Sequence, residues 1–353
     1  MVPFNPKTGE SANDYFIIDV EAHIMPKEYQ EHVSYYPESE ALAYAHKMAQ
    51  HWIWTDHRTG KQPRQHIGMD WTAEKMIKDF DEAGIDVGCI LRESMLEDSK
   101  FGAPFSTNYH IIQARDKYPN RFIAMSNVGP HLHRGVENAI WELEYLHTQR
   151  GFKLTKVYSP EDGPLNDRRM WPFYEKCQEL GIVVCFHTGL TIKIGRTSYC
   201  TPILLDDVLT DFPDLKCIAY HAGFPNFEEL VMLAWKHPNL YISFSLLLPW
   251  LLRAPRRFQH MVGMVCQIVG DDRLIFGTDW PGSDPYESVQ AVLNLEMPEE
   301  LMEQYGYGPI TQETKAKFFG LNLARLLDID PEEWMLPQKK EHRAKKQGQQ
   351  QKS

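Results

Sequence analysis

Short apolar runs alternate with amphipathic segments along most of the chain. The runs are rich in β-branched residues and are followed by turn residues, as buried strands are, and the segments between them repeat apolar residues at helical spacing. Strands are predicted at residues 15–20, 87–91, 122–125, 152–157, 182–186, 215–220, 240–244 and 274–276. Helices are predicted at residues 72–84, 106–118, 134–148, 168–180, 202–211, 226–236, 256–268, 285–295 and 311–328.

Repeated strand–helix units predict a parallel sheet, because parallel neighbours need a crossover connection. Eight such units favour closure into a barrel over an open doubly wound sheet. No Gly-x-Gly-x-x-Gly follows the first strand, which weakens a dinucleotide-binding interpretation. We therefore expect a single-domain (β/α)8 TIM barrel over residues 15–336, preceded by an N-terminal arm at residues 1–14 and ending in helices.

Two segments stand apart from this pattern. Residues 26–70 are the longest interruption and carry tryptophan, histidine and arginine side chains. An insertion after strand 1 lies at the same end of a barrel as the catalytic residues, so it is either a lid or an ordinary surface excursion. Residues 337–353 are rich in lysine and glutamine and nearly without apolar groups, which predicts a disordered basic tail.

Composition excludes several classes of protein. The net charge of -11 over 353 residues argues against general nucleic-acid affinity. No apolar window approaches the ~20 residues that cross a membrane, and the N-terminus lacks the apolar core of a signal peptide. The six cysteines form no Cys-x-x-Cys pair, and Cys89, Cys185 and Cys217 fall in predicted strands. These features predict reduced cysteines in a cytoplasmic protein that binds neither nucleic acid nor membranes.

Four predicted strands lead into carboxylate or imidazole side chains followed by turn residues. The motifs are Asp19-Val20-Glu21-Ala22-His23, Phe186-His187-Thr188-Gly189, Tyr220-His221-Ala222-Gly223 and Phe276-Gly277-Thr278-Asp279-Trp280-Pro281. The C-terminal ends of different strands meet at one mouth of a (β/α)8 barrel, where such folds carry catalytic residues. Side chains alternate along a strand, so Asp19, Glu21 and His23 are expected on one face. We therefore expect convergence at the mouth of Glu21, His23, His187, His221 and Asp279.

Two carboxylates with imidazoles suit a borderline divalent cation such as Zn²⁺, Mn²⁺, Co²⁺ or Fe²⁺. His221 could then act as an acid or base beside the metal, since imidazole titrates near neutral pH. Each residue also has a structural interpretation. A buried histidine can be an ordinary core residue, Asp279 can cap the helix that follows, and Glu21 can pair with a lysine in the barrel. Taken jointly, the four motifs favour a metal site.

With these motifs the chain resembles the metal-dependent amidohydrolase superfamily. It is most similar to the branch that contains aminocarboxymuconate-semialdehyde decarboxylase and γ-resorcylate decarboxylase. The resemblance covers roughly residues 15–330 and also includes the run from Gly151 to Lys156. It implies one divalent ion, Zn²⁺ or Mn²⁺, and a homodimer or homotetramer. The metal ligands that it implies are Glu21, His23, His187 and Asp279, and the catalytic residues are His221 and Asp279.

Three features depart from these relatives. The first motif is Glu-x-His, which is like the γ-resorcylate type and unlike the His-x-His of the aminocarboxymuconate type. The γ-resorcylate type has a glutamate three residues after the strand-6 histidine, where this chain has Phe224. The aminocarboxymuconate type has an arginine downstream of that histidine, and none follows His221 in residues 222–230. The chain therefore matches neither enzyme in detail, so neither of their substrates can be assigned to it from the motifs.

The resemblance implies non-oxidative decarboxylation of an aromatic or unsaturated, hydroxylated carboxylic acid. His221 or Asp279 would deliver a proton to the carbon that loses CO₂. Candidate groups for binding this small-molecule substrate are the cations Arg92, Lys156 and Arg196 and an apolar wall of Phe244 and Trp280.

Three alternatives stay open. The first is hydrolysis of a lactone, amide or cyclic imide by a metal-bound hydroxide at the same site. In a binuclear form of this site, Lys153 or Lys156 would bridge the two ions. The second is hydration of an unsaturated acid. The third is a non-catalytic barrel that binds an anion.

Overall fold

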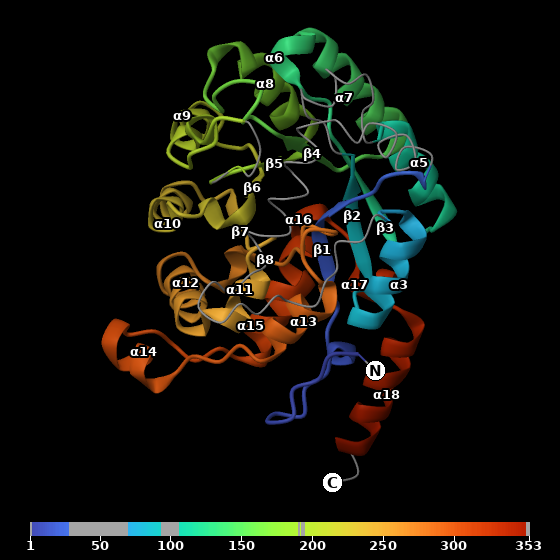
Figure 1. The fold of residues 1–353 in the computed structure, drawn as a ribbon, viewed down its shortest axis with the longest axis vertical. Coiled ribbons are helices and arrows are strands. Elements are labelled where there is room, and N and C mark those ends of the chain that lie inside the picture. The colour runs from blue at the N-terminus through green and yellow to red at the C-terminus, as the bar shows by residue number, and fades with distance from the viewer. Residues whose placement is uncertain (1, 28–69, 93–105, 190, 192–194, 351–353) are drawn as a thin grey trace, which may run out of the picture.

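A computed structural model describes residues 2–27, 70–92, 106–189, 191 and 195–350 (Figure 1). Eight parallel strands form one sheet, each hydrogen-bonded to the next in chain order. The strands are β1 (Ile18–His23), β2 (Val87–Leu91), β3 (Phe122–Ser126), β4 (Leu154–Val157), β5 (Val183–Phe186), β6 (Cys217–Ala219), β7 (Leu240–Ser243) and β8 (Leu274–Ile275). Val20 N donates to Phe276 O over 3.1 Å and joins the last strand to the first. The predicted (β/α)8 barrel is confirmed.

Helices surround the sheet, as Figure 1 shows. They are α3 (Ala73–Ala83), α5 (Asn108–Lys117), α6 (His131–Arg134), α7 (Val136–Arg150), α8 (Trp171–Leu180), α9 (Leu204–Asp211), α10 (Phe227–Lys236), α11 (Leu248–Arg253), α12 (Pro255–Ile268), α13 (Pro285–Leu293), α14 (Glu299–Tyr305), α15 (Gln312–Ala316), α16 (Asn322–Leu327), α17 (Pro331–Trp334) and α18 (Pro337–Gln350). Sequence periodicity did not predict the short helices α6, α11, α14 and α17. A π-helical turn, η7 (Lys317–Leu321), interrupts the helix predicted at 311–328.

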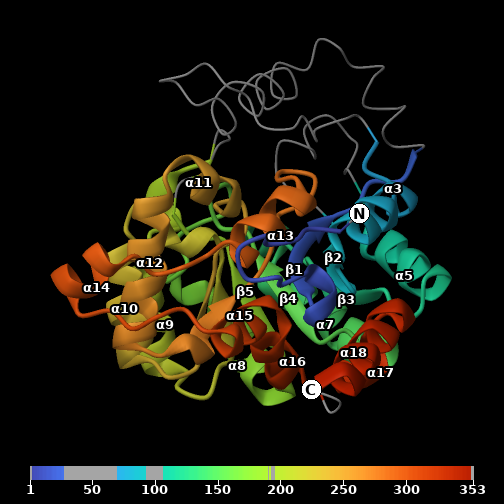
Figure 2. The same ribbon diagram turned by 90° about the horizontal axis from the view of Figure 1, so that it is seen from below.

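Apolar side chains pack in two shells. Inward residues of the strands, such as Val87, Cys89 and Cys185, fill the barrel together with Leu323 and Leu327 of the α16 segment. Figure 2 places α16 against one end of the strands, so this helix closes that end. A larger cluster, which includes Phe80 and Phe173, lies between the outside of the strands and the surrounding helices. In such barrels the functional residues lie at the other end, at the C-terminal ends of the strands. We refer to this end as the open end.

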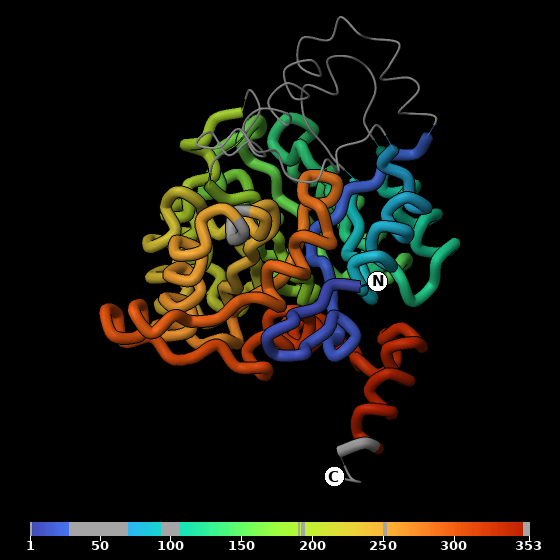
Figure 3. The backbone as a smooth tube through the Cα atoms, turned by 60° about the horizontal axis from the view of Figure 1, so that its bottom comes forward, coloured from blue at the N-terminus to red at the C-terminus, as the bar shows by residue number. Residues whose placement is uncertain are grey.

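The segments at the two ends of the chain pack against the barrel. Asn5 Nδ2 donates to Leu293 O over 2.9 Å, and Figure 3 shows the blue N-terminal arm beside the orange segment that contains α13. The short 3₁₀ helix η1 (Ala12–Asp14) ends this arm. Asp14 accepts hydrogen bonds from His342 Nε2 and Lys346 Nζ of α18, over 3.1 and 2.8 Å.

The predicted disordered tail is wrong for residues 337–350, which form α18. The composition is polar, but one of its lysines is buried rather than solvated. Lys339 Nζ lies 2.6 Å from Asp86 Oδ2 and 2.7 Å from Tyr15 O, and both charged side chains are inaccessible to solvent. Asp86 thus orders the tail, because its buried charge requires a partner. Residues 351–353 lie outside the described part of the chain.

Three further predictions concern the insertion, the cysteines and membrane-spanning segments. Most of the predicted insertion, at residues 28–69, lies outside the described residues. All six cysteines are free thiols, and Cys266 is half-buried while the others are buried. Within the described ranges, no helix has both the length and the apolar character needed to cross a membrane.

We expect Lys339→Ala to lower the free energy of unfolding by about 3 kcal/mol, because it leaves the Asp86 carboxylate buried without its ammonium partner. Lys340→Ala is the matched control, since Lys340 is the exposed neighbour on the same helix, and should change stability by less than about 0.5 kcal/mol. Urea unfolding followed by circular dichroism measures both. Equal effects of the two substitutions would contradict a stabilising role for the ion pair of Lys339 with Asp86.

Candidate active site at the open end of the barrel

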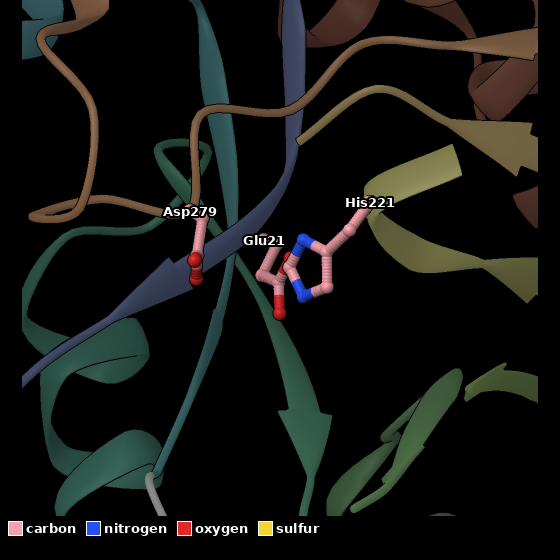
Figure 4. A group of neighbouring side chains, drawn as sticks. All are labelled: Glu21, His221 and Asp279. Carbon is pink, nitrogen blue, oxygen red and sulfur yellow. The ribbon is translucent and has the colours of Figure 1, made fainter. Parts of the chain in front are cut away.

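The structure gathers the five predicted site residues at the C-terminal ends of the strands. Glu21, His221 and Asp279 point toward one another in Figure 4, and ligand atoms of the three lie within 4.8 Å of one another. His23 Nε2 lies 3.0 Å from Asp279 Oδ1 and 3.7 Å from Glu21 Oε1. His187 Nδ1 lies 3.1 Å from His221 Nε2. The five side chains thus form one continuous cluster, and the imidazoles and Glu21 are buried.

An extra residue in β1 aims its side chains into this cluster. Asp19 pairs with Gly88 and Ala22 with Ile90, so three steps along β1 match two along β2. Such a β-bulge shifts the alternation of faces by one residue. As a result Val20 packs in the barrel interior while Ala22 packs on the outside. The strand itself begins at Ile18 and reaches His23, three residues later than predicted.

The bulge makes one sequence prediction wrong. Asp19 was expected on the face of Glu21 and His23, but it turns toward the segment after β8. It accepts hydrogen bonds from Thr278 N over 2.9 Å, from Thr278 Oγ1, and from Glu21 N over 3.1 Å. Burial raises the pKa of Asp19 to about 7, although these hydrogen bonds oppose the shift. Asp19 therefore braces the first strand against the motif that carries Asp279.

The chain turns sharply where β6 and β8 deliver their functional side chains. His221 and Ala222 have φ values of 57° and 46°, and Asp279 has a φ of 57°. These are left-handed conformations that cost roughly 1–2 kcal/mol for a residue with a Cβ atom. Such strain often marks functional sites. The N-cap of α13 is Asp284, whose side chain accepts from Tyr286 N and Glu287 N, so helix capping does not explain Asp279.

Gly189 lets the ends of β5 and β6 pack closely. Gly189 has a φ of 87°, and a Cβ atom there would lie 2.3 Å from Phe224 O and 2.8 Å from Gly223 C. Thr188 Oγ1 donates to Tyr220 O over 2.6 Å across the same junction. The close approach of the His-Thr-Gly and His-Ala-Gly motifs therefore requires a glycine at position 189. This approach brings His187 next to His221.

Charges in the cluster are unevenly compensated. Lys156 Nζ of β4 lies 2.9 Å from Glu21 Oε1, and Ser245 Oγ donates to Glu21 Oε2 over 2.7 Å. Burial alone would raise the pKa of Glu21, but the charges of Lys156 and the histidines hold it well below its usual value. Burial and the Glu21 charge raise the pKa of Asp279, against the opposing contact from His23. Lys156 thus compensates Glu21, while the partly buried Asp279 contacts the imidazole of His23.

This donor set fits a divalent metal ion. The mutually close ligand atoms belong to two carboxylates and an imidazole, with the imidazole of His23 in contact with both carboxylates. Oxygen and imidazole ligands suit Mn²⁺ or Zn²⁺. A cation would also relieve the repulsion that raises the pKa of Asp279. The residues present are therefore able to hold such an ion.

Among the predicted substrate-binding cations, Lys156 contacts the cluster through Glu21. Arg92 Nε and Nη2 donate to the carbonyl oxygens of Asn127 and Gly129, over 2.6 and 2.9 Å. Arg92 therefore braces the loop after β3. Arg196 is exposed, and its guanidinium lies 5.8 Å from the Tyr199 ring centroid.

The predicted apolar wall of Phe244 and Trp280 is wrong. Phe244 is inaccessible to solvent and packs on Phe258 and Phe318, with ring centroids 5.0 and 5.6 Å apart. Trp280 is also buried, and its Nε1 donates to Asp79 Oδ2 of α3 over 3.1 Å. Both side chains belong to the layer between the strands and the helices, because their strand ends turn them away from the mouth.

Ser245 and Tyr158 contact the cluster but were not among the residues predicted from the sequence. Ser245 follows β7 and contacts both Glu21 and His221. Tyr158 follows β4, and its ring centroid lies 4.9 Å from that of His187. Neither residue type is diagnostic by itself. Their positions just beyond strand ends were the available signal, because that is where a barrel collects its functional groups.

The amidohydrolase family (Amidohydro_2) matches residues 18–329, and the chain belongs to this family. No curated protein matches the chain in sequence. Solved structures that resemble it include 5-carboxyvanillate decarboxylase from Novosphingobium aromaticivorans, with bound manganese and 3-methoxy-4-hydroxy-5-nitrobenzoic acid. That pair has a TM-score of 0.61 and 16% identity, covering 93% of this chain and 100% of the other.

Two further solved structures share the fold. 2,6-Dihydroxybenzoate decarboxylase from Rhizobium has a TM-score of 0.56 and 16% identity, covering 89% of this chain and 99% of its own. 4-Oxalomesaconate hydratase from Rhodopseudomonas palustris has a TM-score of 0.53 and 16% identity, covering 95% and 100%. The family match confirms the resemblance to the amidohydrolase superfamily that the motifs indicated, and the decarboxylases among these neighbours share its fold.

We expect Gly189→Ala to destabilise the protein much more than Gly151→Ala. Both glycines have positive φ, but a Cβ at Gly151 meets nothing within 4 Å, whereas one at Gly189 collides with the backbone of Phe224. The Gly151 variant should lose roughly 1–2 kcal/mol from conformation alone, and the Gly189 variant clearly more. Urea unfolding of the two variants makes the comparison. Equal losses would show that the β5–β6 junction relaxes without cost.

Proposed function

We propose that this protein is a metal-dependent carboxy-lyase that removes CO₂ from a small aromatic or unsaturated, hydroxylated carboxylic acid. The observation that carries the proposal is the buried cluster of Glu21, Asp279, three imidazoles and Lys156 at the open end of an amidohydrolase barrel. Solved structures of 5-carboxyvanillate and 2,6-dihydroxybenzoate decarboxylases with the same fold support it. The predicted assembly as a homodimer or homotetramer and the predicted cytoplasmic location stay predictions.

We assign the ion, Mn²⁺ or Zn²⁺, to Glu21, His23, His187 and Asp279. When bound, it would supply positive charge that stabilises negative charge developing on the substrate. His221 competes with His187 for the role of ligand, since its ligand atom lies within 4.8 Å of those of Glu21 and Asp279. We keep His221 as the acid or base because that is the role of the strand-6 histidine in the family that the chain resembles.

Charge favours an anionic substrate at this site. Two ionised carboxylates and the Lys156 ammonium sum to -1 (-2 + 1), and a divalent cation changes the sum to +1 (-1 + 2). A buried site with net positive charge attracts a carboxylate. Lys156 is therefore the residue of this chain that makes the loaded site cationic, beyond its hydrogen bond to Glu21.

The reaction requires one proton from the protein. The bond between the carboxylate carbon and the ring or alkene carbon breaks, and its electron pair stays on the latter. That carbon takes a proton from His221 or Asp279, and CO₂ leaves. Burial raises the pKa of Asp279 in the metal-free protein, whereas a bound cation would favour its ionised form, so the loaded site favours His221 as the proton donor.

The binuclear form of the competing hydrolase hypothesis needs a lysine that bridges two metal ions. Lys153 is unsuited, because its Nζ donates to Leu327 O over 2.7 Å at the closed end of the barrel. Lys156 is at the correct end but pairs with Glu21. Hydration of an unsaturated acid uses the same cluster, and 4-oxalomesaconate hydratase shares the fold. The mass of the product separates these reactions.

We expect about one divalent ion per chain, measured by elemental mass spectrometry after loading with Mn²⁺ or Zn²⁺. His187→Ala and Asp279→Ala should lose most of the bound metal, because each removes an assigned ligand. His221→Asn should retain the metal. Loss of metal from the His221 variant with full retention by the His187 variant would exchange the roles of the two histidines. Full retention by the Asp279 variant would end the four-ligand assignment.

The activity itself is tested with hydroxylated benzoic acids and unsaturated acids that carry ¹³C in the carboxyl group. We expect release of ¹³CO₂ from the metal-loaded enzyme, and at least a 100-fold lower rate for His221→Asn, since a positioned acid or base contributes about 10²–10⁴-fold. Lys340→Ala, with its exposed side chain, should match the wild-type rate. A product heavier by one water without labelled CO₂ would replace decarboxylation by hydrolysis or hydration.

A further inference from the structure

Ser245 lies between Glu21 and His221 in the candidate site. It follows β7 and is fully buried. Its Oγ donates to Glu21 Oε2 over 2.7 Å. On the other side, its carbonyl oxygen and its Oγ lie 3.2 and 3.3 Å from His221 Nδ1. One residue thus contacts an assigned metal ligand and the assigned acid or base.

Counting protons fixes the direction of these hydrogen bonds. The hydroxyl of Ser245 has a single hydrogen, and the carboxylate of Glu21 can only accept it. Both atoms of Ser245 that face His221 therefore act as acceptors, so Nδ1 of His221 must carry its hydrogen. In the neutral imidazole, Nε2 is then an acceptor.

The hydrogen position on His221 in turn determines the one on His187. His221 Nε2 faces His187 Nδ1 over 3.1 Å. With His221 Nε2 as the acceptor, His187 donates from Nδ1 and keeps its lone pair at Nε2. A neutral imidazole binds a metal ion through such a lone pair. The chain from Glu21 through Ser245 and His221 to His187 thus has one consistent direction.

The local backbone holds Ser245 in this position. Ser245 N donates to Ser243 Oγ over 3.2 Å, and Leu246 follows with a φ of 67°. On the opposite side lies Gly277, where an added Cβ would come within 3.1 Å of Ser245 Cβ. The glycine of the Phe-Gly-Thr-Asp motif therefore makes room for Ser245. These contacts show that the serine is closely confined.

We propose that Ser245 is a positioning residue, which orients the Glu21 carboxylate for metal binding and sets the proton positions on His221 and His187. The inference rests on the proposed function only in taking the cluster to bind a divalent ion, and it requires no particular substrate. Partners that orient metal ligands in this way commonly contribute about 10–100-fold to metal affinity.

The first test compares Ser245→Ala with Ser126→Ala in the full chain. Ser126 is a buried serine at the end of β3 whose Oγ donates to Leu154 O over 3.3 Å. The dissociation constant for Mn²⁺, measured by competition with a fluorescent chelator, should rise roughly 10–100-fold for Ser245→Ala and stay near the wild-type value for Ser126→Ala. Unchanged affinity in the Ser245 variant would overturn the proposal, and thermal unfolding of both metal-free variants checks that they fold.

The second test reads the proton positions directly and needs no metal. In metal-free protein labelled with ¹⁵N-histidine, long-range ¹H–¹⁵N spectra distinguish a hydrogen on Nδ1 from one on Nε2. We expect Nδ1–H for both His221 and His187, with signals assigned from His221→Gln and His187→Gln. A hydrogen on Nε2 of His221 would overturn the proposal. If the wild-type protein bound no divalent ion, the proposed function would fail, and this spectrum would still decide the proton positions.

Discussion

The buried charge of Glu21 is the constraint on which the open end of the barrel depends. Its side chain is inaccessible to solvent, and an isolated carboxylate in such surroundings costs several kcal/mol. Lys156 from β4 and Ser245 from the end of β7 each contact one of its oxygens. The bulge in β1 is what brings the carboxylate to them. Satisfying this one charge therefore draws separate strands to a common point.

Lys156 and Ser245 stabilise the charge of Glu21, but they leave its repulsion with Asp279 in place. Asp279 lies beside Glu21, and the negative charge of Glu21 contributes to its raised pKa. His221 and Asp279 are both held in left-handed backbone conformations. A fold optimised only for stability would avoid this repulsion and strain. The free energy of binding a cation there would include relief of the repulsion, so the cost borne by the free protein favours the loaded state.

The fold and the members of the cluster could be predicted because both depend on regular patterns. Period-two and helical repeats located the strands and helices, and a barrel brings the ends of its strands together wherever they fall in the sequence. The prediction failed where one residue changes the geometry. The bulge turned Asp19 to another face, and the left-handed turn at Asp279 sent Trp280 toward α3.

Ser245 and the C-terminal helix were missed for a related reason. A serine has no diagnostic chemistry until its neighbours are known, and those neighbours come from β1 and β6. Lysine-rich composition predicts a solvated tail only if every lysine reaches water. Lys339 instead meets Asp86, which is more than 250 positions away in sequence. Long-range partners of single polar groups are what local patterns do not contain.

Buried charges elsewhere in the described chain provide the contrast that identifies the functional end. Lys315 meets Glu10, and Lys339 meets Asp86, each as one cation with one anion and each with a main-chain carbonyl as a further acceptor. Those pairs join the terminal segments to the barrel and leave no charge uncompensated. At the open end, the contacts of the described residues give Glu21 and Asp279 one ammonium group, that of Lys156 on Glu21, while Asp279 contacts the imidazole of His23. An excess of buried negative charge is expensive unless a ligand completes it. This excess of carboxylates over lysines supports the proposal that the site binds a cation and, with it, an anionic substrate.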